Sequence, residues 1–317
     1  MITVVVVTYN HEKYIAECLD SILSQKIDEP LQILVGDDQS TDSTASIVKA
    51  YSYKYPNQVF PIIRRKNMGP TKNLLELVNK ADGEYIAFCD GDDYWSDTYK
   101  LEKQLKLLNV DKKCSGCVSH VGIVDENGQR NISQTVNWLR GQPKYTLAMY
   151  EGFDIPGHLS SLVVKNNGFI NKAYNEGLFV DPLIADRYIF LAALVEGHIR
   201  CCEEELSVYR FIRGKIKVNA MSQIYRAKKS WVMNDLTNIL ELQKWLLVNH
   251  SIKKKFVKYK SQLIVTLLFQ KLKGYNISFY DFFKHCDYKF VVILRLPRSV
   301  VERIIYKCKF LFGNQMR

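Results

Sequence analysis

The chain has 317 residues, of which 47% are hydrophobic and 24% are charged, a composition that fits a packed globular protein and excludes a disordered one. Its eight cysteines are too scattered for a disulfide-based fold, and no apolar run approaches the roughly 18–20 residues that a membrane-spanning helix needs. The net charge is +11, and the opening run 1–7 has the character of a buried strand rather than a signal peptide, so we expect a cytoplasmic protein with reduced thiols.

The first 120 residues alternate between strand and helix patterns. Apolar or β-branched runs predict strands over 3–8, 31–36, 58–64 and 84–89. Apolar residues at helical spacing predict helices over 12–25, 43–53, 70–80 and 97–108. Strands separated by single helices predict a parallel sheet with right-handed crossovers.

The pattern loosens after Ser115. Strands are expected over 116–124, 160–165 and 200–209, and helices over 182–196, 225–248 and 254–272. The last expected helix, over 299–312, carries apolar residues on one stripe with basic residues beside it. This helix is either a membrane-surface element or a helix that caps the core.

The charge is distributed unevenly along the chain. From Arg210 to the end there are 23 Lys/Arg and 5 Asp/Glu, whereas residues 1–209 have 21 Lys/Arg and 28 Asp/Glu. A basic segment of this kind suits an anionic partner such as membrane headgroups, phosphorylated lipid or nucleic acid. The alternative is a solvated helical face that only keeps the protein soluble.

Polar clusters follow three of the predicted strands directly. They are Thr8-Tyr9-Asn10, Asp37-Asp38 and Asp90-Gly91-Asp92-Asp93. In open α/β sheets ligands bind at the carboxyl ends of the strands, and five carboxylates gathered there would repel one another without a cation. Mg²⁺ or Mn²⁺ with a diphosphate would satisfy them, although Asp-Gly-Asp alone is also a helix-capping turn.

These three motifs resemble the signatures of the inverting glycosyltransferases of family 2, except that the second motif has Gln39 where the family usually has Gly. The resemblance implies a GT-A fold, which is an α/β, Rossmann-like and mostly parallel sheet flanked by helices, with a C-terminal helical extension. It implies a catalytic domain over 1–218, with a nucleotide-sugar half over about 1–110 and an acceptor half over about 111–218, and a basic helical region over 219–317.

The resemblance also implies roles for individual residues. The residues expected to bind the nucleotide sugar are Thr8, Tyr9, Asn10, Asp38, Lys72, Asp90, Asp92, Arg210 and Arg213. Asp92 and Asp93 are expected to hold Mn²⁺ or Mg²⁺, and His158 is expected to line the acceptor site. Asp186 is expected to be the catalytic base, with Asp181 as the alternative.

The implied reaction moves one sugar, with inversion, from a nucleotide sugar such as a UDP-sugar to an acceptor hydroxyl. The basic C-terminal region favours a lipid-diphosphate-linked glycan as acceptor, as in O-antigen or capsule synthesis, and peripheral attachment to the anionic inner face of the cell membrane.

Three other classes of protein were weighed against this one. A haloacid-dehalogenase-like phosphatase also has an Asp-x-Asp motif after a strand, but usually after its first strand. A basic nucleic-acid-binding protein would suit the charge, but no helix-turn-helix, zinc-finger or RNP signature is present, so no nucleic acid is expected. A zinc protein would use Cys114, Cys117, Cys201 and Cys202, of which only the first two have a ligand-like spacing.

Overall fold

The computed structural model of the chain describes residues 1–130, 142–151, 155–212, 231–272, 279–301 and 303. The chain divides into two compact units. Unit 1 comprises Met1–Tyr150, Ile155–Asn175 and Asp181–Ala220, and unit 2 comprises Glu151–Asp154, Glu176–Val180 and Met221–Arg317. The predicted domain boundary at residue 218 falls outside the described residues and stays a prediction.

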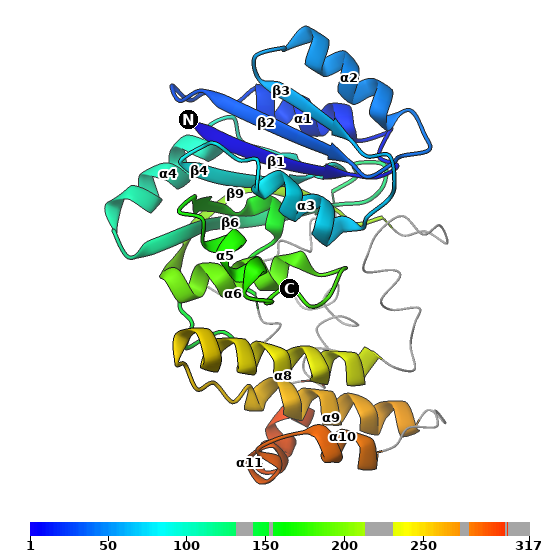
Figure 1. Cartoon of the computed structure of the whole chain (residues 1–317), viewed down its shortest axis with the longest axis vertical. Coiled ribbons are helices and arrows are strands. Elements are labelled where there is room, and N and C mark those ends of the chain that lie inside the picture. Colours follow the sequence, from blue (N-terminus) through cyan, green and yellow to red (C-terminus); the bar gives the residue numbers. More distant parts are fainter. Residues whose placement is uncertain (131–141, 152–154, 213–230, 273–278, 302, 304–317) are drawn as a thin grey trace. The chain divides into compact units, whose positions relative to one another are not determined.

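Unit 1 begins with four parallel strands in the order β3-β2-β1-β4 (Figure 1). They are β1 (Ile2–Thr8), β2 (Leu31–Asp37), β3 (Val59–Ile63) and β4 (Tyr85–Asp90). The helices between them are α1 (Ile15–Leu23), α2 (Thr44–Lys54) and α3 (Pro70–Val78). Strands buried on both faces need continuous apolar runs, which explains the valines of β1. The parallel pairing of the four strands confirms the predicted parallel α/β sheet.

The second half of the sheet is mixed. β8 (Val163–Lys165) pairs antiparallel with both β4 and β6 (Cys114–Val124), and β6 runs parallel to β9 (His198–Arg210). Two short strands, β5 (Tyr94–Trp95) and β7 (Lys144–Tyr145), pair antiparallel with β9. The helices of this half are α4 (Lys100–Val110), α5 (Phe169–Asn175) and α6 (Ala185–Glu196).

The register of β1 brings the three polar motifs to one edge of the sheet. Thr8 of β1 pairs with Asp37 of β2, and Val7 pairs with Asp90 of β4. Because the three strands are parallel, their carboxyl ends meet at this edge, where open α/β sheets bind their ligands.

The strand expected over 160–165 is shorter than predicted. Residues Leu159–Ser161 form a turn of 3-10 helix, and the strand begins only at Val163. His158 caps this turn, because its Nδ1 accepts a hydrogen bond from the Ser160 amide at 3.3 Å. The polar residues of this segment therefore lie in a turn at the carboxyl edge of the sheet and are not part of the strand.

Unit 2 is helical over its longer described segments. Its helices are α8 (Trp231–His250), α9 (Val257–Leu272), α10 (Phe279–His285) and α11 (Lys289–Leu294). Their shared core includes Leu236, Leu263, Leu267, Phe282 and Val292. Of the basic helix expected over 299–312, only residues 299–301 and 303 are described. None of the described helices is long and apolar enough to cross a lipid bilayer.

Candidate active site

The loops that follow β1 and β2 are tied to each other through Asn10. Its side-chain Oδ1 accepts a hydrogen bond from the Thr41 backbone amide at 2.8 Å. Its backbone N–H donates to Ser40 Oγ at 2.9 Å. Asn10 has a φ of +57°, a left-handed conformation that Asn adopts more readily than most residues. Asn10 thus fixes the two loops in register at the carboxyl edge.

The Asp38 carboxylate joins the end of β2 to the loop before α3. Its Oδ1 accepts a hydrogen bond from the Met68 amide at 2.8 Å, and its Oδ2 accepts one from the Gly69 amide at 2.9 Å. Asp38 is only 4% exposed, so these charge-assisted hydrogen bonds hold it firmly. Each oxygen retains a second lone pair that a ligand could use.

Gln39 occupies the position where the resemblance leads one to expect glycine. Its φ of +64° lies in the left-handed region, which is costly for a residue with a Cβ. Two hydrogen bonds offset this strain: Gln39 Nε2 donates to the Arg65 carbonyl at 3.0 Å, and Gln39 Oε1 accepts from the Asn67 amide at 2.9 Å.

Asp93 is the buried anchor of the acidic motif after β4. Its Oδ2 accepts a hydrogen bond from Ser160 Oγ at 2.5 Å, and its Oδ1 accepts one from the Arg210 amide at 2.9 Å. Burial, and then the charges of Asp92 and Asp90, raise the pKa of Asp93 well above its ordinary value. Both oxygens of this predicted metal ligand are therefore already engaged within the protein.

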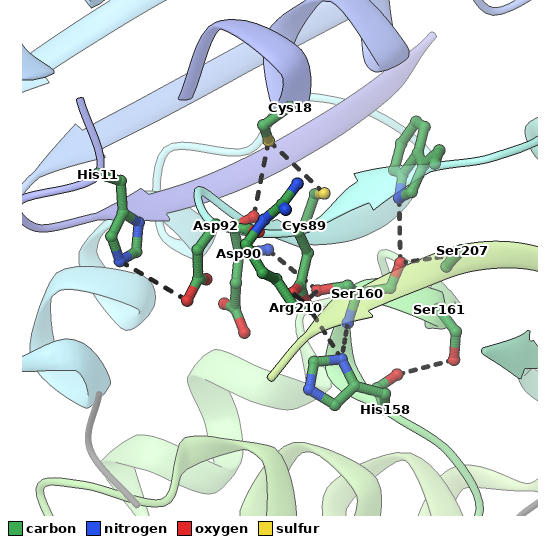
Figure 2. Close-up of polar contacts among 12 residues, drawn as sticks. His11, Cys18, Cys89, Asp90, Asp92, His158, Ser160, Ser161, Ser207 and Arg210 are labelled. Carbon is green, nitrogen blue, oxygen red and sulfur yellow. Dashed lines mark hydrogen bonds and ion pairs between the residues drawn. The ribbon is translucent and has the colours of Figure 1, made fainter. Parts of the chain in front are cut away.

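Asp90 and Asp92 present the more accessible carboxylates of the motif (Figure 2). Within the described residues no hydrogen bond reaches either carboxylate, although His11 Nε2 lies 3.8 Å from Asp92 Oδ2. Burial, and then the charges of Asp92 and Asp186, raise the pKa of Asp90 to about 8. A bound cation would relieve this repulsion. Sequence analysis did not select His11, although it directly follows the first polar motif.

His158 completes a set of three converging side chains. One potential ligand atom from each of Asp90, Asp93 and His158 lies within 4.8 Å of the other two. Burial lowers the pKa of His158, against the charges of Asp186 and Asp92, so its imidazole is neutral at pH 7. Carboxylates suit Mn²⁺ and Mg²⁺, so Asp90, whose oxygens accept no hydrogen bond among the described residues, fits a divalent ion. Both Asp93 oxygens and His158 Nδ1 already accept hydrogen bonds, and they would join the ion only by giving these up.

Arg210 lies beneath the acidic motif and is only 3% exposed. Its Nε donates to the Asp92 carbonyl at 3.0 Å, and its NH2 donates to Glu17 at 2.5 Å. Its guanidinium also stacks 4.6 Å from the centre of the Tyr14 ring. Its NH1 donates to the Asp125 carbonyl at 3.3 Å, so three of its N–H groups have partners inside the protein. Arg210 holds the backbone of the acidic motif in place, and its contact with a diphosphate stays a prediction.

Asp186 faces the acidic motif from the first turn of α6. It is half-buried, and its charge contributes to raising the pKa of Asp90. Its Oδ1 accepts a hydrogen bond from the Arg187 amide at 2.8 Å. Asp181, the alternative base, caps the turn before α6, because its Oδ1 accepts a hydrogen bond from the Leu183 amide at 2.9 Å.

The remaining predicted residues differ in their surroundings. Thr8 is buried at the end of β1, and its Oγ1 has no hydrogen-bond partner among the described residues. Tyr9 is half-buried beside it. Lys72 is exposed on the first turn of α3, and Arg213 lies outside the described residues.

Ser160 is a central residue that sequence analysis missed. Its Oγ accepts a hydrogen bond from the Asp90 amide at 3.1 Å and donates one to Asp93, and its carbonyl accepts from Trp95 Nε1 at 3.0 Å and Ser207 Oγ at 3.1 Å (Figure 2). The one available signal was the polar run that it forms with His158 between two apolar segments.

The four cysteines of the zinc alternative do not form a metal site in the described part of the chain. Cys114, Cys117 and Cys202 are buried and Cys201 is half-buried, and none of these thiols belongs to a set of three converging ligand atoms. They pack instead as small apolar side chains.

A parallel four-stranded sheet with an Asp-x-Asp motif at its carboxyl edge, continued by mixed strands, defines the GT-A class of glycosyltransferases. The crystal structure of Staphylococcus aureus TarS 1–349 in complex with UDP-GlcNAc shares this fold. Its TM-score is 0.60 at 22% sequence identity, and the match covers 84% of this chain and 71% of TarS 1–349.

Sequence comparison identifies the family. The model of glycosyl transferase family 2 matches residues 3–171, more than half of the chain. An uncharacterized protein of Mycobacterium tuberculosis is 30% identical over 212 residues, which are 66% of this chain and 58% of that protein. The poly(ribitol-phosphate) beta-glucosyltransferase of Bacillus spizizenii is 42% identical over 96 residues, which are 29% of this chain and 15% of that protein.

The chain therefore belongs to glycosyl transferase family 2. It spans 58% of the length of its mycobacterial relative. The family assignment favours this class over the haloacid-dehalogenase-like phosphatase.

Proposed function

We propose that the protein is a metal-dependent, inverting glycosyltransferase that moves one sugar from a UDP-sugar to an acceptor hydroxyl. The observation that carries this proposal is the gathering of Thr8, Asp38 and the acidic motif at one edge of the sheet, with Asp186 facing them from α6. TarS 1–349 was crystallised in complex with UDP-GlcNAc, which supports UDP as the nucleotide.

A divalent ion would be held at the acidic motif. Asp90 converges with Asp93 and His158. Among the described residues, its carboxylate accepts no hydrogen bond. Asp92 is the second accessible carboxylate, whereas Asp93 is committed to Ser160 and Arg210. When bound, Mn²⁺ or Mg²⁺ would neutralise the charge that develops on the leaving diphosphate.

The residues at the ends of β1 and β2 would bind the nucleotide. Tyr9, half-buried beside the edge of the sheet, would stack on the uracil ring, and Asp38 would accept a hydrogen bond from its N3–H group. Thr8 Oγ1, a buried hydroxyl without a partner among the described residues, would offer a further polar contact. Lys72, Arg210 and Arg213 stay predicted contacts of the diphosphate.

Asp186 would act as the general base. It would take the proton from the acceptor hydroxyl while that oxygen attacks the anomeric carbon from the face opposite the leaving diphosphate. A single displacement of this kind inverts the anomeric configuration. His158, beside the same carboxylates, would border the acceptor as well as the ion.

The acceptor we propose is a lipid-diphosphate-linked glycan of a bacterial surface polysaccharide, reached at the inner face of the cell membrane. The strongly basic sequence after Arg210 supports an anionic surface as a partner. The proposed catalytic domain spans 1–218, and the basic helical region spans 219–317.

A thermal-shift screen of nucleotide sugars, with Mn²⁺ and with EDTA, tests the proposed donor. Ligand that binds only the folded state raises the apparent melting temperature by mass action. We expect UDP and at least one UDP-sugar to stabilise the protein only when Mn²⁺ is present. Stabilisation by GDP or TDP but not by UDP would contradict the choice of nucleotide.

A further inference from the structure

The segment that begins with α11 has one face packed against α9. Val292 is fully buried, and Ser299 is fully buried with its Oγ 2.6 Å from Ser261 Oγ of α9. Arg303 continues this inner face, because its NH1 donates to Thr266 Oγ1 at 2.5 Å. Helical backbone resumes over 296–301 after a turn at residue 295. Val292 and Ser299 are seven residues apart and both fully buried, so the two helical stretches bury the same side.

The opposite face of the same segment is exposed and apolar. Val291 is 42% exposed, Leu294 is 65% exposed and Val301 is 54% exposed, and Arg298 is exposed between the last two. Their spacing of i, i+3, i+7 and i+10 places these four residues on one side of a helix. We call this set (Val291, Leu294, Arg298 and Val301) the outer face.

Basic side chains flank the outer face. The described residues 279–301 and 303 hold five Lys/Arg, of which Lys284 of α10 and Lys289 of α11 are exposed, and two Asp/Glu. One of these two acids, Asp287, is engaged by Lys260 Nζ of α9, and the other, Asp281, is exposed. The described surroundings of the outer face therefore carry a net positive charge. Exposed apolar residues among basic ones are the combination that binds an anionic lipid interface, where the apolar groups enter the acyl boundary and the cations meet the headgroups.

We propose that the outer face is the surface through which unit 2 lies on a membrane that contains anionic lipids. This inference deepens the membrane attachment in the proposed function, and it assigns that attachment to α11 and its continuation, upstream of most of the helix expected over 299–312. Charge complementarity favours a lipid surface over a second copy of the chain, because two outer faces would bring like charges together.

Vesicle co-sedimentation of the full chain tests this surface. The vesicles are pure phosphatidylcholine or an equimolar mixture with phosphatidylglycerol. We expect the wild-type protein to bind the anionic vesicles at least about tenfold more tightly, and high salt to weaken this binding. The doubly substituted variant Leu294→Asp/Val301→Asp and the variant Arg298→Glu should each lose most of it.

Matched controls come from an exposed part of α8 in the same unit. Leu247 is 54% exposed and the Lys244 side chain is 72% exposed, so Leu247→Asp and Lys244→Glu make comparable changes away from the outer face. We expect both control variants to bind anionic vesicles as the wild-type protein does. Circular dichroism melting curves verify that every variant is folded.

Three results would overturn the inference. They are no binding of the wild-type protein to anionic vesicles, equal binding by the outer-face variants, and a dimer in solution that only those variants disrupt while vesicle binding persists. UDP binding with Mn²⁺ is measured on the same samples. Retained vesicle binding without UDP binding would count against the proposed function alone, and the reverse pattern against the outer face alone.

Discussion

Arg210 Nε donates a hydrogen bond to the backbone carbonyl of Asp92 at 3.0 Å, although the two residues are 118 positions apart in the sequence. This bond ties the end of β9 to the acidic motif after β4. Arg210, for which sequence analysis predicted a contact with the diphosphate, thus also holds the backbone that carries the accessible carboxylates.

We therefore predict that Arg210→Met lowers the free energy of unfolding by about 2–4 kcal/mol, because the Asp92 and Asp125 carbonyls and the Glu17 carboxylate lose a donor. Urea denaturation measures this change. Arg200→Met, at a half-buried arginine of the same strand, is the control and should cost less than about 1 kcal/mol. Equal losses in the two variants would show that Arg210 has no special positioning role.

At Gln39, alanine and glycine should have different effects. Gln39→Ala keeps the strained left-handed backbone and loses both side-chain hydrogen bonds, so we expect a loss of about 1–2 kcal/mol. Gln39→Gly loses the same bonds but relieves the strain, so it should be about 1 kcal/mol more stable than Gln39→Ala. Chemical denaturation of the pair checks this order, and a more stable alanine variant would contradict it.

The burial of Lys100 leads to a prediction about how stability depends on pH. Lys100 is 0% exposed, its Nζ donates to Gln104 Oε1 at 2.6 Å, and it lies 4.3 Å from the centre of the Trp95 ring. Burial lowers the pKa of Lys100 to about 7. Between pH 7 and about 10.4, the pKa of an unfolded lysine, the unfolded state binds more protons, so this group's contribution to stability rises with pH.

Lys100→Met should therefore stabilise the protein most at pH 7, by about 1–4 kcal/mol, and least near pH 10. Denaturation at both pH values measures the difference. Lys106→Met, at an exposed lysine of the same helix, should shift stability little at either pH. A Lys100→Met effect that does not change with pH would rule out a buried, titrating amine.

Asp186→Asn should separate binding from turnover. The variant keeps the size of the side chain but cannot accept the proton, so release of UDP from an active UDP-sugar should fall about 10²–10⁴-fold. Affinity for UDP with Mn²⁺ should stay within about threefold of wild type, because the base acts on the acceptor. Asp181→Asn is the paired variant, and normal turnover by Asp186→Asn with loss by Asp181→Asn would transfer the role to Asp181.

Much of the nucleotide half of unit 1 was predictable because its signals are local. The apolar runs of β1 and β4 and the polar residues that end them are contiguous in sequence, and parallel pairing alone brings Thr8, Asp37 and Asp90 to one edge. Burial of both faces does not fix the register of these strands, because an apolar run stays apolar after a one-residue slip; the polar residues that end each run indicate it.

The second half of the site depends on contacts that no local pattern reports. Ser160 reaches Asp93 across 67 positions, and Arg210 reaches Glu17 across 193. A resemblance to a family transfers a residue's type and place but not its partners, so it did not indicate that Arg210 binds the Asp92 carbonyl and Glu17. The fit of His158 to a metal ion likewise depends on a 3-10 turn where the apolar pattern indicated a strand.

The most direct test of the account is isothermal titration calorimetry of UDP into the wild-type protein and the variants Asp90→Asn and Asp92→Asn, with Mn²⁺ and with EDTA. We predict that Mn²⁺ strengthens UDP binding to the wild-type protein at least about tenfold, and that each substitution removes most of this gain. Equal UDP affinity with Mn²⁺ and with EDTA, or an undiminished gain in both variants, would contradict a metal-dependent nucleotide site at the acidic motif.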